Sequence, residues 1–216
     1  MNAPSVPQAP RAGDRHRLVW HEEDLALIRR KAVDLCVWRR GLDERLAEWC
    51  QAIARSHAVD IDDEFPSAEL PLDALLSDLP EVPARKLLLD DIAARAQAYA
   101  RLIGCERLRL QLHAVRHQHC PRFHVDSVGV RLITTYAGPA TEWIAETDLE
   151  RPRVGKGSTT DVPARPMTEP RRLERFDVAL MKGRSWRGNG PFGLVHRSPP
   201  IEDQPRLVLT LDARAE

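Results

Sequence analysis

The pattern of apolar and polar positions changes near the middle of the chain. Before Gly104 most apolar residues recur at helical spacing, whereas after it they alternate with polar residues, as in half-buried strands. Pro83 suits a first helical turn and Gly104 a C-terminal cap. The acidic stretch between Ser56 and Leu72 predicts a loop. The expected N-terminal elements are a short helix over Glu22–Ile28, a strand over Ala32–Trp38, and helices over Leu42–Ser56, Leu72–Leu79 and Pro83–Ile103.

The second half of the chain predicts at least six strands. They are expected over residues 107–112, Val128–Tyr136, Thr141–Ile144, Phe176–Met181, Leu194–His196 and Arg206–Leu211. The segment Leu149–Pro170 is rich in Pro and Gly, so it predicts a long loop, either a lid or disordered. Helices followed by antiparallel strands favour an α+β fold, with the helices on one sheet of a β-sandwich or barrel.

Composition narrows the class of protein. Lys and Arg total 32 and are matched by 32 Asp and Glu, which gives no electrostatic reason to expect a nucleic-acid or membrane partner. The four cysteines form no CxxC pair, and the N-terminus has no apolar signal region. We therefore expect a soluble cytoplasmic protein with a disordered tail (1–17), a mostly helical part with one strand (18–104) and a β-rich part (105–216). The sequence does not predict an oligomeric state.

Three residues suggest a metal centre. His124 and Asp126 are two positions apart, so in an extended segment they point to the same side and can share one ion. His196 would add a second imidazole from another strand. Two histidines and one carboxylate are the ligand set of non-haem iron(II) oxygenases. The alternative interpretation is structural, with His124 and Asp126 bonded to each other or capping a turn.

Arg206 follows His196 by ten positions and begins the last predicted strand. A fixed guanidinium near a metal is well shaped to hold a carboxylate through two parallel hydrogen bonds. The alternative is an ion pair across the sheet with an Asp or Glu.

Another possible site lies just before the first motif. His113, His117, His119 and Cys120 are zinc-ligand types, and the three histidines share strand parity. The competing interpretation is a solvated surface cluster, with Cys120 as a small buried residue beside the first metal.

Taken together, these pieces resemble the double-stranded β-helix (jelly-roll) oxygenases that use iron(II) and 2-oxoglutarate. The segments that carry the resemblance are His124-Val125-Asp126, Phe176–Gly183, His196 with Ser198-Pro199-Pro200, and Arg206. The resemblance covers residues 107–212. It implies a jelly-roll core with the N-terminal helices packed on its major sheet. It also implies iron held by His124, Asp126 and His196, and 2-oxoglutarate anchored by Arg206.

The sequence departs from this pattern at Val208, where many such oxygenases carry a hydroxyl. We expect the missing hydrogen bond to the acid to come from Tyr136 or Thr134. The paired His-x-His of the first cupin motif is also absent, which argues against cupin chemistry in the narrow sense.

A closer resemblance is to a bacterial family known only as a domain of unknown function. It rests on the segments Cys120–Asp126 (CPRFHVD), Thr134–Trp143 (TTYAGPATEW) and Gly193–Pro200 (GLVHRSPP). Members often lie beside zinc-homeostasis genes. That resemblance therefore implies an alternative function, a non-enzymatic zinc- or iron-binding protein using the same His/Asp/His site.

Overall fold

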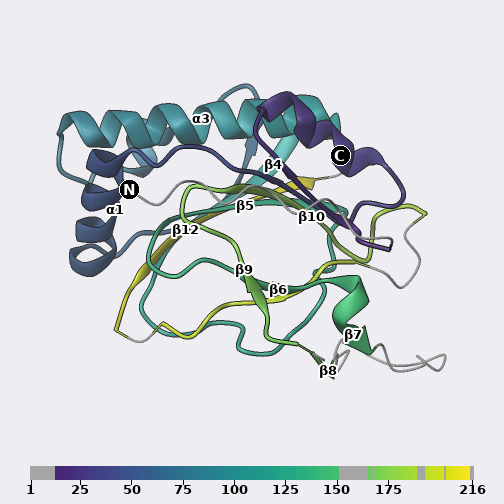
Figure 1. The fold of residues 1–216 in the computed structure, drawn as a ribbon. Coiled ribbons are helices and arrows are strands. Elements are labelled where there is room, and N and C mark those ends of the chain that lie inside the picture. Colours follow the sequence, from purple (N-terminus) through teal and green to yellow (C-terminus); the bar gives the residue numbers. More distant parts are fainter. Residues whose placement is uncertain (1–12, 151–164, 167, 189–192, 202, 215–216) are drawn as a thin grey trace.

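The structure is a computed structural model that describes residues 13–150, 165–166, 168–188, 193–201 and 203–214. A large sheet forms its middle layer, with the long helices on one face and a small sheet on the other (Figure 1). The strands of the large sheet, in spatial order, are β1 (His16–Val19), β2 (Leu35–Trp38), β10 (Val178–Lys182), β5 (Val130–Ala137), β12 (Arg206–Arg214), β4 (Arg107–Val115) and β3 (Asp60–Pro66).

The remaining elements flank this sheet. The small sheet has the order β11 (Val195–Arg197), β6 (Glu142–Ile144) and β9 (Arg171–Arg172). A separate pair joins β7 (Leu149–Glu150) to β8 (Arg165–Pro166). The helices are the 3-10 helices η1 (Glu22–Arg29) and η2 (Glu146–Asp148), and the α-helices α1 (Glu44–Ser56), α2 (Leu72–Leu75) and α3 (Pro83–Ile103). The predicted α+β class is confirmed. None of the described helices combines the length and the apolar character needed to cross a bilayer.

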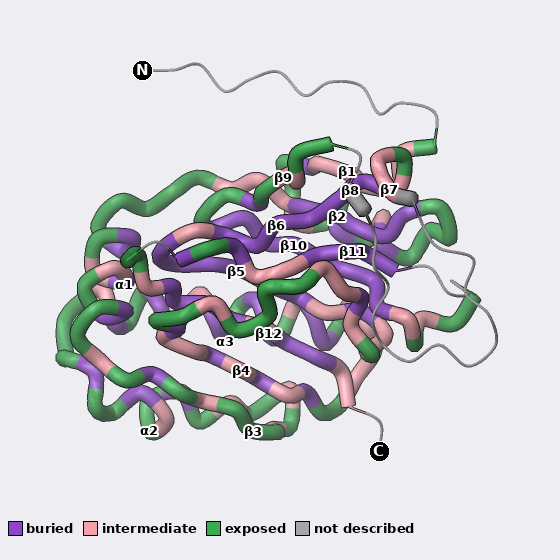
Figure 2. The backbone as a smooth tube through the Cα atoms, turned by 90° about the horizontal axis from the view of Figure 1, so that it is seen from below, coloured by how far each residue is buried: buried purple, intermediate pink, exposed green. Residues whose placement is uncertain are grey.

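The large sheet separates two apolar cores. Along β5, Leu132 packs in the core beneath the helices, whereas Ile133 packs in the core that faces the small sheet. On β12, Leu209 and Val208 divide in the same way. This follows from the two-residue period of a strand. Figure 2 shows β5 and β10 buried along nearly their whole length, while β3 is mostly exposed.

The two long helices form where the sequence predicts them. Asp43 caps α1 by accepting a hydrogen bond from the backbone N–H of Leu46, which satisfies a donor that the first turn leaves open. Pro83 lies in the first turn of α3, and Gly104 ends that helix in the left-handed region at φ 76°.

Several predicted elements were wrong in type or extent. Residues Asp60–Pro66 form a strand, where a loop was expected, because β4 pairs with them along their length. Arg109 binds Asp62 with two hydrogen bonds, which offsets the low strand propensity of an acidic segment. The residues predicted as a short helix, Glu22–Ile28, form a 3-10 helix. The helix predicted over Leu72–Leu79 ends at Leu75.

Two predictions fall partly or wholly outside the described residues. The tail predicted over 1–17 is described only from residue 13, and its last two residues, His16 and Arg17, begin β1. The long loop predicted over Leu149–Pro170 lies mostly outside the described residues, and only its flanking pair, β7 and β8, is seen.

Candidate metal centre

His124 and His196 are brought together by backbone pairing. They form an antiparallel bridge in which the N–H of each residue donates to the carbonyl of the other, at 3.0 Å in both directions. β11, which carries His196, is fixed in turn by β6, where Trp143 stands opposite His196. A loop residue and a strand residue 72 positions apart are therefore held in register, and their rings lie 4.6 Å apart between centroids.

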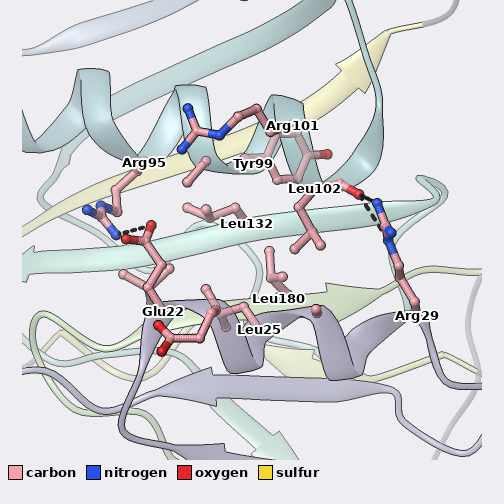
Figure 3. Close-up of a pocket in the computed structure, with 13 residues that line it drawn as sticks. Glu22, Leu25, Arg29, Arg95, Tyr99, Arg101, Leu102, Leu132 and Leu180 are labelled. Carbon is pink, nitrogen blue, oxygen red and sulfur yellow. Dashed lines mark hydrogen bonds and ion pairs between the residues drawn. The ribbon is translucent and has the colours of Figure 1, made fainter.

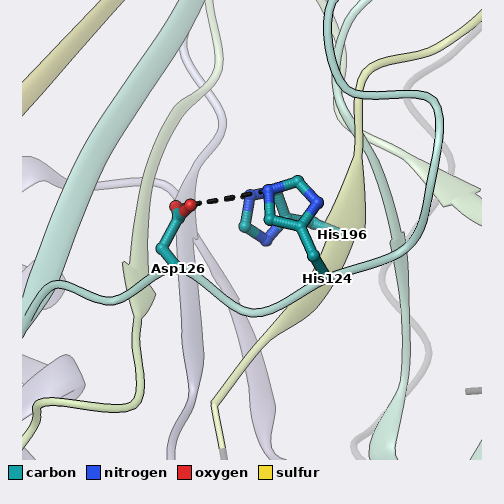
Figure 4. A group of neighbouring side chains, drawn as sticks. All are labelled: His124, Asp126 and His196. Carbon is teal, nitrogen blue, oxygen red and sulfur yellow. Dashed lines mark ion pairs between the residues drawn. The ribbon is translucent and has the colours of Figure 1, made fainter. Parts of the chain in front are cut away.

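Asp126 completes the group (Figure 4). Its Oδ1 lies 3.5 Å from Nε2 of His124 and its Oδ2 lies 3.4 Å from Nε2 of His196. One ligand atom from each of the three residues lies within 4.8 Å of the others. The structure thus brings together all three residues that the sequence proposed as metal ligands.

The two imidazoles are oriented with Nε2 toward the shared space. Nδ1 of His124 lies 2.9 Å from the carbonyl oxygen of Arg122, and Nδ1 of His196 lies 3.1 Å from that of Leu194. A carbonyl only accepts, so these contacts favour the tautomer with the proton on Nδ1. Nε2 then keeps its lone pair for a metal, as in many histidine-metal sites.

Asp126 is held in its ionised form. Burial alone would raise the pKa of its carboxyl group, but the close His124 and His196 imidazoles and the positive charge of Arg131 hold that pKa well below its ordinary value. The pKa of His124 is raised, mainly by the Asp126 carboxylate beside its ring. A permanently ionised carboxylate between two imidazoles suits a divalent cation.

Arg206 is the second unusual group. It is only 2% exposed, and burial together with the nearby positive charge of Arg172 lowers the pKa of its guanidinium from 12.5 to about 10. Among the described residues no carboxylate forms an ion pair with it, and its Nε has no hydrogen-bond partner there. The ion pair across the sheet, considered above as the alternative, is therefore not formed with these residues.

Two hydroxyl groups contact Arg206 instead. Its Nη1 donates to Ser198 Oγ at 3.2 Å and its Nη2 to Thr141 Oγ1 at 3.3 Å. Ser198 follows His196 by two positions, so both side chains point to the same side of the extended segment. Arg206 therefore lies on the side of the small sheet toward which His196 points. The sequence analysis missed both hydroxyls, although the parity of Ser198 with His196 was a usable signal.

Tyr136 and Thr134 are not part of this arrangement. The Tyr136 hydroxyl donates to Asp91 Oδ2 of α3 at 2.7 Å, and the ring packs in the core beneath the helices. Thr134 lies between Leu132 and Tyr136 in strand parity and stands opposite Leu209, which belongs to that same core. Both side chains are therefore on the face of the sheet away from Val208. The structure does not bring them together with Arg206.

The second candidate cluster does not assemble. His117 and His119 are exposed with ring centroids 5.4 Å apart, and Nδ1 of His113 lies 2.6 Å from Asp60 Oδ1. Cys120 is exposed and is not the buried neighbour of the metal considered above. Within the part of the chain that the structure describes, His124, Asp126 and His196 form the one group with metal-ligand spacing.

A cavity of about 430 Å³ lies elsewhere, between η1 and α3 (Figure 3). Leu25, Leu132 and Leu180 line it on the helix-covered side of the sheet. Some of the charged groups at its rim are paired with each other, because Arg95 donates a hydrogen bond of 2.7 Å to Glu22. No residue of the candidate metal centre contributes to this cavity.

Comparison with known proteins places the chain in a family. Residues 20–212 match the family described as "Protein of unknown function (DUF1826)". The chain belongs to this family. The match spans both the helical part and the β-rich part, so the two halves occur together in the DUF1826 family. No curated protein sequence matches the chain.

Solved structures give a likeness in fold. Dioxygenase for auxin oxidation 1 from Arabidopsis thaliana, in complex with 2-oxoglutarate, has a TM-score of 0.51 at 9% identity, covering 93% of this chain and 92% of that one. The rice dioxygenase for auxin oxidation gives 0.48 at 13% identity, covering 93% and 82%. A Pseudomonas putida prolyl-4-hydroxylase gives 0.44 at 10% identity, covering 90% and 97%. The first of these shows a shared fold. At sequence identities this low, none of the three is evidence for the activity of this chain.

Proposed function

We propose that this protein is a non-haem iron(II)- and 2-oxoglutarate-dependent oxygenase acting on a substrate still to be identified. The observation that carries the proposal is Arg206, a buried guanidinium without an acid partner among the described residues, which contacts Ser198 two residues beyond His196 of the His/Asp/His group. Burying an uncompensated charge is costly, so such a group persists where a ligand completes it.

The position of Arg206 fits a small dicarboxylate. Arg206 contacts Ser198, which lies two residues beyond His196, and two residues of strand advance the chain by roughly 7 Å. An extended five-carbon acid spans a comparable length, so one end can reach the metal while the other reaches Arg206. The hydroxyls of Ser198 and Thr141 are available to hydrogen-bond the same distal carboxylate. They would replace the hydroxyl that is missing at Val208.

His124, Asp126 and His196 would hold the metal through the two Nε2 atoms and one carboxylate oxygen. This donor set fits iron(II) and leaves one side of the ion open. When bound, iron(II) supplies the redox chemistry in which dioxygen and 2-oxoglutarate are converted to succinate, carbon dioxide and an oxidised substrate. The residues of this chain orient the acid, and the apolar core between the two sheets limits the access of water.

The proposal includes a jelly-roll core. The apolar cluster that includes Ile133, Trp143 and Leu194 packs between the large sheet and β6 and β11. We infer that these two sheets are the major and minor sheets of a double-stranded β-helix, with the metal group at the mouth between them. The shared fold with the 2-oxoglutarate complex of the Arabidopsis dioxygenase supports this arrangement.

The alternative function is zinc or iron binding without catalysis. The donor set does not discriminate between the two metals, since zinc also accepts histidine and carboxylate ligands. A metal carrier, however, has no need for a buried guanidinium without an acid partner on the side toward which His196 points. Arg206 therefore favours the oxygenase.

The test is an anaerobic titration of the protein with iron(II) and then with 2-oxoglutarate, followed by exposure to air. An oxygenase is expected to develop a metal-to-ligand charge-transfer band with 2-oxoglutarate and to form succinate under air. Arg206→Met should lose the band while still binding iron(II). Arg172→Ala is the matched control, because Arg172 is a nearby arginine that donates to Glu142 and is half-exposed.

Two results would count against the proposal. Stoichiometric zinc binding with no charge-transfer band and no succinate would favour the metal-binding alternative. A band of unchanged strength and affinity in Arg206→Met would show that Arg206 does not anchor the acid.

A further inference from the structure

A row of alternating charges crosses the large sheet beside the candidate metal centre. Arg131 of β5 stands opposite Asp212 of β12, and Asp212 stands opposite Arg109 of β4. The row continues from Arg109 to Asp62 of β3 through two hydrogen bonds of 2.5 Å. It begins at Asp126, because Nη1 of Arg131 donates to Asp126 Oδ2 at 2.9 Å. Only the first pair of this row is close to the metal group.

Arg131 is fixed by Asp212 in a two-pronged contact. Its Nε donates to Asp212 Oδ1 at 2.8 Å and its Nη2 to Asp212 Oδ2 at 2.5 Å. Parallel hydrogen bonds between a guanidinium and a carboxylate set the plane of the arginine as well as its distance. The remaining nitrogen, Nη1, is therefore aimed at Asp126 by the geometry of the pair. The orientation of Asp126, which lies in the loop between β4 and β5, thus depends on a residue of β12.

Asp212 also controls the charge near the metal. A lone arginine next to Asp126 would repel a divalent cation and weaken its binding. The Asp212 side chain is only 2% exposed, so its charge is poorly screened by solvent and offsets that of Arg131 at close range. The pair supplies an oriented hydrogen bond to Asp126 while adding little net charge.

We propose that Arg131, neutralised by Asp212, is a positioning residue that holds the Asp126 carboxylate ready for the metal. The inference rests on the proposed metal centre, but not on the use of 2-oxoglutarate. Supporting groups of this kind typically contribute 10- to 100-fold to metal affinity. The competing explanation is that Arg131 and Asp212 only join β5 to β12.

A cobalt(II) titration of the full-length protein separates the two explanations. Cobalt(II) takes similar ligands, and its visible absorption reports their number and arrangement. The main variant combines Arg131→Met with Asp212→Asn, so that no buried charge is left without its partner. Arg109→Met is the matched control, because it breaks the next ion pair along the same row without contacting Asp126.

The double variant is expected to bind cobalt(II) roughly 10- to 100-fold more weakly, with an altered absorption spectrum. Arg109→Met should retain the wild-type affinity and spectrum. Arg131→Lys tests the same point if the double variant folds poorly. Lysine keeps the charge but cannot hold Asp212 in a two-pronged contact and hydrogen-bond Asp126 at the same time. That variant should therefore also bind more weakly.

Wild-type affinity and spectrum in the double variant or in Arg131→Lys, each folded as judged by thermal unfolding, would overturn the inference. So would an equal loss of affinity in Arg109→Met, because the effect would then be general to the sheet. A wild-type protein that binds cobalt(II) but gives no signal with 2-oxoglutarate would contradict the proposed oxygenase and leave the positioning role supported by its own variants. Failure of the wild-type protein to bind cobalt(II) would overturn both.

Discussion

Replacing Arg206 with Met is expected to stabilise the metal-free protein while removing its response to 2-oxoglutarate. The two effects have one cause. Arg206 is buried without an acid partner among the described residues, so the folded protein carries a charge that it does not compensate. Met is unbranched, flexible and uncharged, so it can fill the part of the space that the aliphatic stem of Arg206 occupies. If Arg206 only stabilised the fold, its replacement with Met would lower the free energy of unfolding.

The size of the effect follows from the pKa. A guanidinium pKa of about 10 against the ordinary 12.5 corresponds to roughly 3 kcal/mol that burial costs the charged form, at about 1.4 kcal/mol for each tenfold change. The substitution also removes the hydrogen bonds to Ser198 and Thr141, which at 3.2 and 3.3 Å are long and are therefore taken as about 1 kcal/mol each. The net expectation is a stabilisation of about 1 kcal/mol, or a Tm higher by roughly 2–4 °C for a chain of this size.

Thermal unfolding without metal measures this difference directly. The second measurement adds iron(II) and 2-oxoglutarate without oxygen, where a ligand at 100 times its Kd should stabilise the wild-type protein by about 2.7 kcal/mol. Arg206→Met should show the metal effect but no further gain from 2-oxoglutarate. A variant that is less stable than the wild-type protein by 1 kcal/mol or more without ligands would refute the idea of an uncompensated charge.

Three further predictions concern Tyr136, Asp177 and Gly183. Tyr136→Phe should lower the free energy of unfolding by about 1–2 kcal/mol through loss of its buried hydrogen bond, with unchanged affinity for 2-oxoglutarate by titration. Burial raises the pKa of Asp177 to about 6, so its contribution to stability is present below about pH 4 and is lost as the pH rises through 6. Asp177→Asn should therefore become more stable than the wild-type protein over that range, by up to roughly 3 kcal/mol above pH 6 in chemical denaturation. Gly183→Ala should weaken metal binding, since its Cβ would lie 2.6 Å from the Asp126 carbonyl oxygen, while Gly41→Ala, with no atom within 4 Å, should not.

The sequence determined the parts of this protein that depend on local spacing. The helical period and the capping residues fix α1 and α3, and the two-residue spacing of His124 and Asp126 is enough to propose that they share an ion. The spacing also sufficed to single out Arg206, because it follows His196 by ten positions at the start of the last predicted strand.

Only the tertiary structure decided which faces and partners these residues have. β5 is buried on both sides, so its alternation does not tell which side meets the helices, and the structure places Tyr136 on the helix side. A shift of one residue reverses every side chain in a strand, and the irregular register between Leu207 and Val208 adds to that ambiguity. The acidic strand β3 likewise depends on its pairing with β4, which also supplies Arg109 as a partner for Asp62. The contact of Arg206 with the Thr141 hydroxyl and the Arg131–Asp212 pair join residues 65 and 81 positions apart. Such contacts are set by sheet packing and cannot be found from the spacing of residues along the sequence.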